Sequence, residues 1–332
     1  MPVTKDAVLW GFRFFLGREP ESEESIRLHS NARDEQHLAE ILISSREFDL
    51  KQRFRGLPIG RMSLDMRPID VETEATPEEL HACLAKIKAA WEHLGESRPH
   101  FSVLTNAQFL PQRLGQTIGE FWASGEHEGE QIVRTLRRHG HSLTGTCVEY
   151  GCGVGRMTMV LARGFREVHG YDISAAHLRC AQERAGELDV RNVVLHECPA
   201  GILLQLEPCD FFYSRIVFQH NPPPVIVELI RMALGALKRG GIAIFQVPTY
   251  ITGYHFNLTE WLSTDHPLDM QMHCVPQSRI FQLIAEHGCM ALEVREDNST
   301  GSDRMLSNVF VARKCERQGR LAQHGLFPSG TS

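Results

Sequence analysis

Residues 145 to 174, GTCVEYGCGVGRMTMVLARGFREVHGYDIS, decide the fold class of this chain. The apolar run at 146–150 has the composition of a short buried strand. It leads into a glycine-rich turn at 151–155, where glycine permits a sharp turn and lets a ligand approach the backbone closely. Apolar spacing at 156–162 then predicts a helix whose N-terminal N–H groups face a crevice. This order predicts one half of an α/β sheet that binds a nucleoside.

The residues around the turn narrow the choice of nucleoside. A second strand, predicted at 167–171, ends at Asp172, which is placed to accept hydrogen bonds from a ribose. The dinucleotide fingerprint needs a small residue where this chain has Arg156, which disfavours an NAD-dependent oxidoreductase. Glu149, two residues before the first glycine, would repel a pyrophosphate but suits a cationic ligand. A glycine turn without a ligand is the structural alternative, and the combined pattern disfavours it.

This stretch resembles the first motif of the class I S-adenosylmethionine-dependent methyltransferases. In that family the glycine loop lies under the methionine part of the cofactor, and the second-strand acid binds both ribose hydroxyls. The resemblance implies S-adenosyl-L-methionine as the cofactor and a Rossmann-like, doubly wound sheet of seven mostly parallel strands, the seventh antiparallel. The implied cofactor-binding residues are Glu149, Gly151, Gly153, Gly155, Asp172 and Ile173.

Composition limits the remaining classes. The chain has 332 residues, enough for one large and one smaller domain, and 42% of them are hydrophobic. A net charge of -6 gives no electrostatic case for nucleic acid. Nine cysteines without a C-x-x-C pair indicate reduced thiols. Because we find no signal peptide and no apolar run long enough to span a bilayer, we expect a cytoplasmic protein without a membrane span.

Residues 1–50 are predicted to form a small all-α unit. One helical face carries Val8, Phe12, Phe15 and Leu16, and another carries Leu38, Ile41, Leu42 and Phe48. The pairing of FLGREP (15–20) with LISSREF (42–48) resembles a bacterial helical module that often accompanies glycosyltransferases and methyltransferases of cell-surface polysaccharide pathways. The resemblance implies a protein partner for this unit, and a helical hairpin without a shared role is the alternative. Residues 51–75, rich in glycine and proline, are predicted to be a linker.

The methyltransferase domain is predicted to span 76–315, with covering helices within 76–140 and the core at 145–315. Thr76 and Glu79 form a capping box for a helix to about residue 93, and two further helices are predicted at 106–123 and 127–139. The stretch FWASG at 121–125 resembles one that contacts the methionine end of the cofactor in related enzymes. That resemblance implies contacts from Trp122 and Gly125, and core packing is the alternative for Trp122.

The strands later in the chain supply further candidate cofactor-binding residues and a candidate general base. In related enzymes the residues after the third strand, here predicted at 191–197, hold the adenine, which nominates Glu197 and Cys198, although Cys198-Pro199 departs from the usual pattern. The run from Asp210 to His220 resembles the D-x-x-x-S-x-x-V-x-Q-H stretch of small-molecule and sugar methyltransferases. It places Ser214 at the cofactor and makes His220 the candidate general base, since imidazole titrates near neutral pH. The alternative is that His220 orders the proline-rich turn after it.

The end of the core is predicted from the same periodicities. Helices are expected at 225–238 and 276–287, and strands at 209–214, 242–247, 290–296 and 308–313. The long segment 248–274 is predicted to be a lid over the acceptor, and its candidate substrate residues are Tyr250, Tyr254, His255 and Trp261. His255, His266 and His273 match no metal-ligand spacing, so we expect no metal. Residues 316–332 are predicted to be a disordered tail.

These features predict a methyltransferase that acts on an oxygen of a sugar or another small hydroxyl compound. Asn221-Pro222-Pro223 is followed by Pro224 rather than by an aromatic residue, which disfavours an exocyclic amine of nucleic acid. The acceptor is therefore expected to be a small molecule or a saccharide. The rival hypothesis is a non-catalytic, cofactor-binding partner of a glycosyltransferase or a polysaccharide-assembly complex. The sequence does not specify the acceptor, the methylated atom or the oligomeric state.

Overall fold

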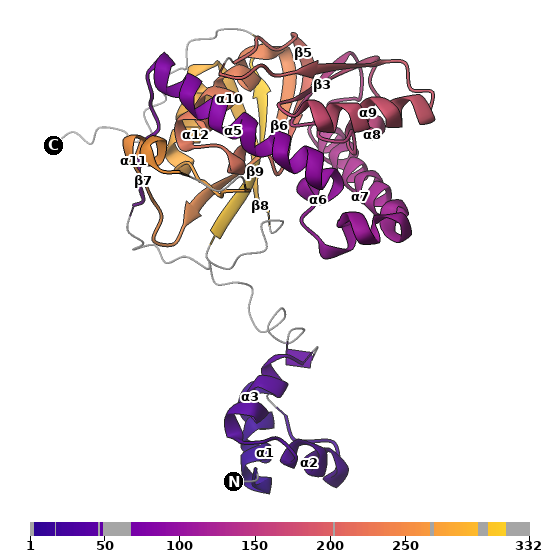
Figure 1. Cartoon of the computed structure of the whole chain (residues 1–332), viewed down its shortest axis with the longest axis vertical. Coiled ribbons are helices and arrows are strands. Elements are labelled where there is room, and N and C mark those ends of the chain that lie inside the picture. Colours follow the sequence, from indigo (N-terminus) through magenta and orange to yellow (C-terminus); the bar gives the residue numbers. More distant parts are fainter. Residues whose placement is uncertain are drawn as a thin grey trace, which may run out of the picture. The chain divides into compact units, whose positions relative to one another are not determined.

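The computed structural model describes residues 3–16, 18–45, 47–48, 68–201, 203–265, 269–297 and 305–316 (Figure 1). The chain forms two compact units, which divide between residues 68 and 69. Residues 51–67 of the predicted linker and 317–332 of the predicted tail lie outside the described residues. Residues 69–75 lie in the second unit, so the boundary comes earlier than the sequence suggested.

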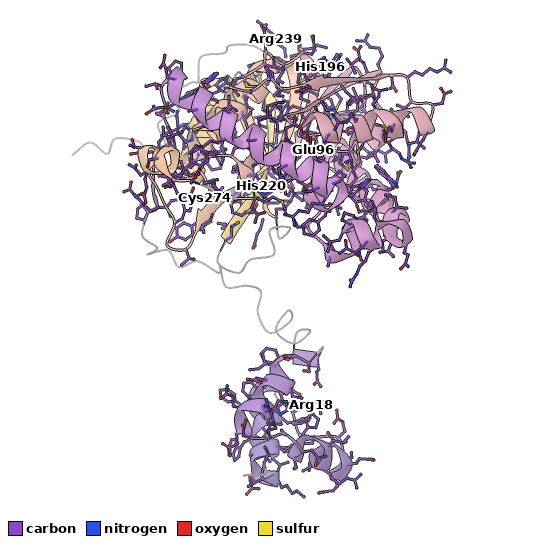
Figure 2. All side chains as sticks on the ribbon, in the orientation of Figure 1. Arg18, Glu96, His196, His220, Arg239 and Cys274 are labelled. Atoms are coloured by element: carbon purple, nitrogen blue, oxygen red, sulfur yellow. The ribbon has the colours of Figure 1, made fainter. Side chains whose placement is uncertain are left out.

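The first unit is helical in its described residues. It contains α1 (Lys5–Gly11), a π-helical turn η1 (Phe12–Leu16), α2 (Glu23–Ser30) and α3 (Glu35–Ile43). The FLGREP and LISSREF motifs of this unit meet through Arg18 (labelled in Figure 2). Its Nε and Nη2 donate to the two carboxylate oxygens of Glu47 at 2.6 and 2.5 Å. Ile41 departs from the predicted buried face, since 38% of it is exposed.

The second unit is built on a seven-stranded sheet with the order β4-β3-β2-β5-β6-β9-β8. The strands are β2 (Thr146–Tyr150), β3 (Glu167–Asp172), β4 (Val193–Glu197), β5 (Cys209–Ser214), β6 (Leu237–Ile251), β8 (Cys289–Glu296) and β9 (Met305–Lys314). The first five strands in this order are parallel, and β9 lies antiparallel between β6 and β8. The sheet therefore has the mostly parallel, seven-stranded arrangement that the resemblance implied.

Helices cover both faces of this sheet (Figure 1). They are α5 (Pro77–Ser97), α6 (Pro99–Val103), α7 (Pro111–Arg138), α8 (Thr158–Leu161), α9 (Ala175–Glu187), α10 (Pro223–Ala236), α11 (Leu258–Ser263) and α12 (Gln277–Glu286), with short 3₁₀ turns η2 (Ala107–Phe109) and η3 (Phe218–His220). Side chains alternate along a strand, so Phe212 packs with α5, α10 and α12, while Phe211 packs with α7 and α8.

Two helix predictions need correction. The helix expected at 156–162 is a single turn, Thr158–Leu161, because residues 153–157 continue the glycine turn. The helices expected at 106–123 and 127–139 form one helix, α7, preceded by η2. Gly125 does not break α7 but allows a close approach, since a Cβ there would lie 2.9 Å from the Arg156 carbonyl oxygen.

The predicted lid is partly regular structure. After β6 it contains β7 (His255–Phe256) and α11, and β7 pairs in parallel with β1 (Asp70–Val71), which comes from the predicted linker. Residues 266–268, including His266, lie outside the described residues. Within the described ranges, no group of three or more potential metal-ligating side chains lies together. None of the helices that the structure describes is long and apolar enough to cross a membrane.

Candidate cofactor and acceptor site

The glycine turn lies at the carboxyl end of β2. Gly151 and Gly153 have φ angles of 77° and 54°, a region that glycine adopts without steric cost. A Cβ on Gly151 would lie 2.3 Å from Val217 Cγ2, and a Cβ on Gly153 would lie 2.7 Å from Val103 Cγ2. Glycine is therefore required at both positions by conformation and by the side chains that cover the turn.

Asp172 ties the turn to the end of β3. Its Oδ2 accepts a hydrogen bond from the Gly153 N–H at 2.7 Å, and its Oδ1 accepts one from the Ser174 N–H at 2.9 Å. Ser174 in turn caps α9 through the His177 N–H. Since an ionised carboxylate offers about four acceptor positions, Asp172 retains capacity for a ligand.

Glu149 is buried under the turn. Burial raises its pKa to about 8, against the opposing effects of a 2.6 Å hydrogen bond from the Thr158 hydroxyl and of the Arg156 charge. A cation bound in this position would favour the ionised carboxylate. The role of Glu149 toward a positively charged ligand stays a prediction.

A cavity opens directly over these residues. Five predicted cofactor residues line it, namely Glu149, Gly151, Gly153, Asp172 and Ile173. Its opposite wall comes from α5 and α6, with Leu84, Ile87, Trp91, Ser102 and Val103. Its volume is about 80 Å³, and the side chains of Val103 and Val217 lie over the glycine turn.

The other predicted cofactor residues do not line this cavity, and their roles stay predictions. Gly155 packs against Met159 and Ala181, and Gly125 packs on Arg156. Trp122 stacks with the Arg184 guanidinium at 4.5 Å, and the Ser214 hydroxyl donates to the Tyr150 carbonyl at 2.8 Å. The Glu197 carboxylate accepts from Lys88 at 2.7 Å, and the Cys198 N–H donates to the Asp172 carbonyl at 2.8 Å.

A buried carboxylate on α7, Glu128, is a site residue that the sequence did not indicate. It accepts hydrogen bonds from Arg156 at 2.8 Å and from the Tyr213 hydroxyl, and it forms an ion pair with Arg215 at 3.1 Å. Burial raises the pKa of Glu128, but the two guanidinium groups outweigh it and hold the pKa below its usual value. Glu128 lies one helical turn after Gly125, and the predicted helix break at this point concealed that relation.

A second, larger cavity of about 870 Å³ adjoins the first. The residues that line both are Ser102, Val103, Glu128, Arg156, Arg215 and Ile216. Ile216 has a φ of 60°, a strained conformation for a β-branched residue, and its N–H donates to Gln246 Oε1 at 2.8 Å. The second cavity also contains His220, Asp269, Met270 and Met272. The two cavities together could hold a cofactor and an acceptor on either side of a shared wall.

His220 lies at the second cavity with both ring nitrogens engaged (labelled in Figure 2). Its Nδ1 is 2.8 Å from the Gln271 carbonyl oxygen, so Nδ1 carries the proton, and its Nε2 is 3.1 Å from Gln219 Nε2. Burial lowers its pKa to about 4, which keeps the imidazole neutral. These contacts tie His220 to Gln271, and the Asn221 amide donates to the Val217 carbonyl at 2.9 Å. The two roles considered for His220, general base and ordering of the proline-rich turn, both stay predictions.

The four lid candidates contact the lid itself and neighbouring strands. Trp261 donates to the Gln271 side chain at 2.8 Å, and the Tyr254 hydroxyl lies 2.7 Å from His273 Nδ1. His255 Nδ1 lies 3.6 Å from Asp70 Oδ2, and Tyr250 pairs with Leu306 in the sheet. None of the four lines either of the two cavities in the part of the chain that the structure describes. Their role toward a substrate stays a prediction.

Comparison with known proteins supports the methyltransferase class that the sequence suggested. Residues 147–241 match the family model of the methyltransferase domain. The chain is 30% identical over 121 residues to a protein-L-isoaspartate O-methyltransferase from Nitrosomonas eutropha (strain DSM 101675 / C91 / Nm57), which covers 36% of this chain and 52% of that protein. The chain thus spans about half the length of the curated relative it matches.

Similar solved structures carry related names. Magnesium protoporphyrin IX methyltransferase from Synechocystis PCC 6803 with bound SAM has a TM-score of 0.47 at 17% identity, covering 69% of this chain and 97% of that one. Phosphoethanolamine N-methyltransferase 2 from Haemonchus contortus has a TM-score of 0.44 at 21% identity, covering 56% and 53%. The domain match and the strand order confirm the predicted methyltransferase fold, and S-adenosylmethionine is the cofactor of this class.

Proposed function

We propose that this chain transfers the methyl group of S-adenosylmethionine to a hydroxyl oxygen of a sugar or another small molecule. The observation that carries the proposal is the shared wall of the two cavities, where Ser102, Glu128 and Ile216 face both spaces. A cofactor over the glycine turn would place its sulfonium near this wall, with the acceptor on the other side. Such transfer depends mainly on orientation, because the sulfonium is intrinsically reactive.

The lining of the second cavity supports a neutral acceptor. Arg156 and Arg215 are balanced there by Glu128 and Asp269, so the lining carries no excess charge to attract an anion or a cation. Phe109, Met270, Met272 and Met305 provide apolar surfaces, and Asn106 and Gln131 provide hydrogen-bonding groups. Mixed apolar and polar walls of this kind suit a sugar or a similar hydroxyl-bearing ring.

An oxygen acceptor is supported by two further observations. The curated relative is named as an O-methyltransferase. His220 also presents a neutral imidazole at the second cavity, in the form that can accept a proton. In the proposed step the hydroxyl displaces Gln219 from Nε2, its oxygen attacks the methyl carbon, and the C–S bond electrons return to sulfur. The hydroxyl proton passes to Nε2.

The proposal is tested by incubating the full chain with S-adenosylmethionine labelled in its methyl group and separate pools of sugars, small phenols, amines and an isoaspartyl peptide. We expect label in a sugar or small-hydroxyl pool, with the methyl on oxygen by mass spectrometry and NMR. Label confined to an amine or to the peptide carboxylate would overturn the acceptor assignment. Cofactor binding without transfer to any pool would favour the non-catalytic partner.

A further inference from the structure

The first cavity contains a buried histidine, His177, that neither the sequence motifs nor the turn explains. It lies in the first turn of α9, and its side chain is 1% exposed. It lines the cavity beside Asp172 and Trp91. Its Nδ1 has no hydrogen-bond partner among the described residues, whereas nearly all buried polar groups in proteins have one.

The contact with Ser102 indicates which nitrogen of the His177 ring carries the proton. The Ser102 hydroxyl, which has a single proton, donates to the Pro99 carbonyl at 2.9 Å and lies 2.8 Å from His177 Nε2. His177 Nε2 must therefore donate to Ser102. With the proton on Nε2, a neutral ring carries a bare lone pair on Nδ1.

A second acceptor lies close to this lone pair. Asp172 Oδ1 is 3.9 Å from His177 Nδ1, too far for a hydrogen bond between them. Gly95 lets α5 pack closely beside this atom, since a Cβ at this position would lie 3.2 Å from Nδ1. Asp172 Oδ1 accepts from the Ser174 N–H, so the acceptor here that lacks a donor within the described part of the chain is His177 Nδ1. A buried acceptor without a donor is unfavourable unless a ligand supplies one, and the Asp172 carboxylate keeps capacity for a second donor of the same ligand.

We infer that His177 and Asp172 together bind the ribose diol of the cofactor, with His177 Nδ1 accepting from one hydroxyl and the Asp172 carboxylate accepting from the other. A vicinal diol offers two O–H donors on neighbouring carbons, which matches two acceptors at this separation. His177 is thus a cofactor-binding residue that discriminates an intact ribose from a deoxyribose. The inference rests on the proposed use of S-adenosylmethionine.

The test measures the binding of S-adenosylhomocysteine and of its 2′-deoxy and 3′-deoxy analogues by calorimetry. In the wild-type chain, removal of the hydroxyl that faces Nδ1 should weaken binding about tenfold. His177→Gln keeps a partner for Ser102 but loses the acceptor at Nδ1, so it should bind S-adenosylhomocysteine and that analogue equally. His177→Asn places an amide oxygen near the Nδ1 position and should restore the discrimination.

His100→Gln is the matched control, because its Nδ1 is also buried without a described partner but lines neither cavity. It should leave all affinities unchanged. If both deoxy analogues lose as much affinity in His177→Gln as in the wild type, His177 does not bind the ribose. If the wild type does not bind S-adenosylhomocysteine, the proposed function itself fails, and this inference with it.

A spectroscopic measurement on the wild-type chain does not depend on the folding of any variant. In ¹⁵N-histidine-labelled protein, the Nδ1 resonance of His177 should shift on addition of S-adenosylhomocysteine, because a bare lone pair gains a donor. The analogue that lacks the relevant hydroxyl should not cause the shift. An unchanged Nδ1 resonance in the saturated complex would overturn the assignment.

Discussion

Glu128 and Arg156 form a buried ion pair, with 2.8 Å between Oε2 and Nη2, although they come from α7 and from the turn after the glycine loop. The pair forms part of the wall between the two cavities. It therefore couples the covering helix to the turn that is proposed to hold the cofactor.

Replacing Glu128 should destabilise the second unit. Glu128→Gln leaves the buried guanidinium group of Arg156 without its carboxylate, whereas Arg215 keeps its pair with Asp297. We expect a loss of about 3–5 kcal/mol in the free energy of unfolding, measured by urea denaturation. Glu126→Gln is the control on the same helix. Its exposed pair with Arg163 should contribute less than about 1 kcal/mol. Equal losses for the two variants would contradict the assigned role.

The loss of stability in Glu128→Gln should depend on pH. The folded-state pKa of Glu128 is depressed, so its stabilisation is present above the unfolded value near 4.5 and is lost as the pH falls through the folded pKa. The stability gap between wild type and Glu128→Gln should therefore be full at pH 7 and shrink in acid below pH 4.5. A gap that does not change with pH would show that charge is not the cause.

Glu149 should produce the opposite pH dependence. Its pKa rises from 4.5 to about 8 on folding, so between these values the folded chain binds more protons than the unfolded chain. Stability should then fall as the pH rises, by up to about 1.4 kcal/mol per pH unit. Glu149→Gln removes this component, and urea midpoints at several pH values in this window compare the slopes. Identical slopes in the two proteins would contradict the raised pKa.

His220 variants separate the two roles of that residue. If His220 is the base, His220→Ala and His220→Asn should both lose about a hundredfold or more in kcat, because neither retains Nε2. Asn can still donate to the Gln271 carbonyl, so recovery of kcat in His220→Asn would indicate a positioning role instead. We expect no recovery, and no inflection in kcat/KM near pH 6.5, because the pKa of His220 is lowered to about 4.

Two lysines on α5 should affect different halves of the site. Lys88 Nζ donates to the Ile173 carbonyl at 2.8 Å and to the Cys198 carbonyl at 3.3 Å, next to Asp172. Lys86 Nζ donates to the Leu262 carbonyl at 2.6 Å, at the lid. Lys88→Met should weaken S-adenosylhomocysteine binding about tenfold, and Lys86→Met should leave it unchanged while raising the acceptor KM. If Lys86→Met weakened S-adenosylhomocysteine binding and Lys88→Met did not, the assignment of Lys88 to the cofactor side and of Lys86 to the acceptor side would be contradicted.

The parts of the fold that the sequence predicted correctly depend on local signals. The strand–turn–acid series from Thr146 to Asp172 is continuous in the chain, and its glycines are needed for their conformation. The capping box of Thr76 and Glu79 is likewise confirmed, because it needs only residues three apart. The antiparallel β9 came from the family resemblance and not from its own residues.

The missed residues depend on contacts between distant segments. Glu128 is 28 positions from Arg156, and Ser102 is 75 from His177. Such contacts follow from how α6 and α7 pack on the core, which local periodicity does not encode. The lid residues that line the second cavity were also not predicted from local sequence. Met270 and Met272 line this cavity, whereas the sequence indicated the aromatic and histidine residues before them.

The central claim is most directly tested by calorimetric titration of the full chain and of Asp172→Ala with S-adenosylmethionine, S-adenosylhomocysteine and NAD. We expect the wild type to bind both sulfur compounds with dissociation constants on the order of micromolar and not to bind NAD. Asp172→Ala, checked for an intact fold by circular dichroism, should lose this binding. Tight NAD binding, or no binding of either sulfur compound by the wild type, would contradict the account.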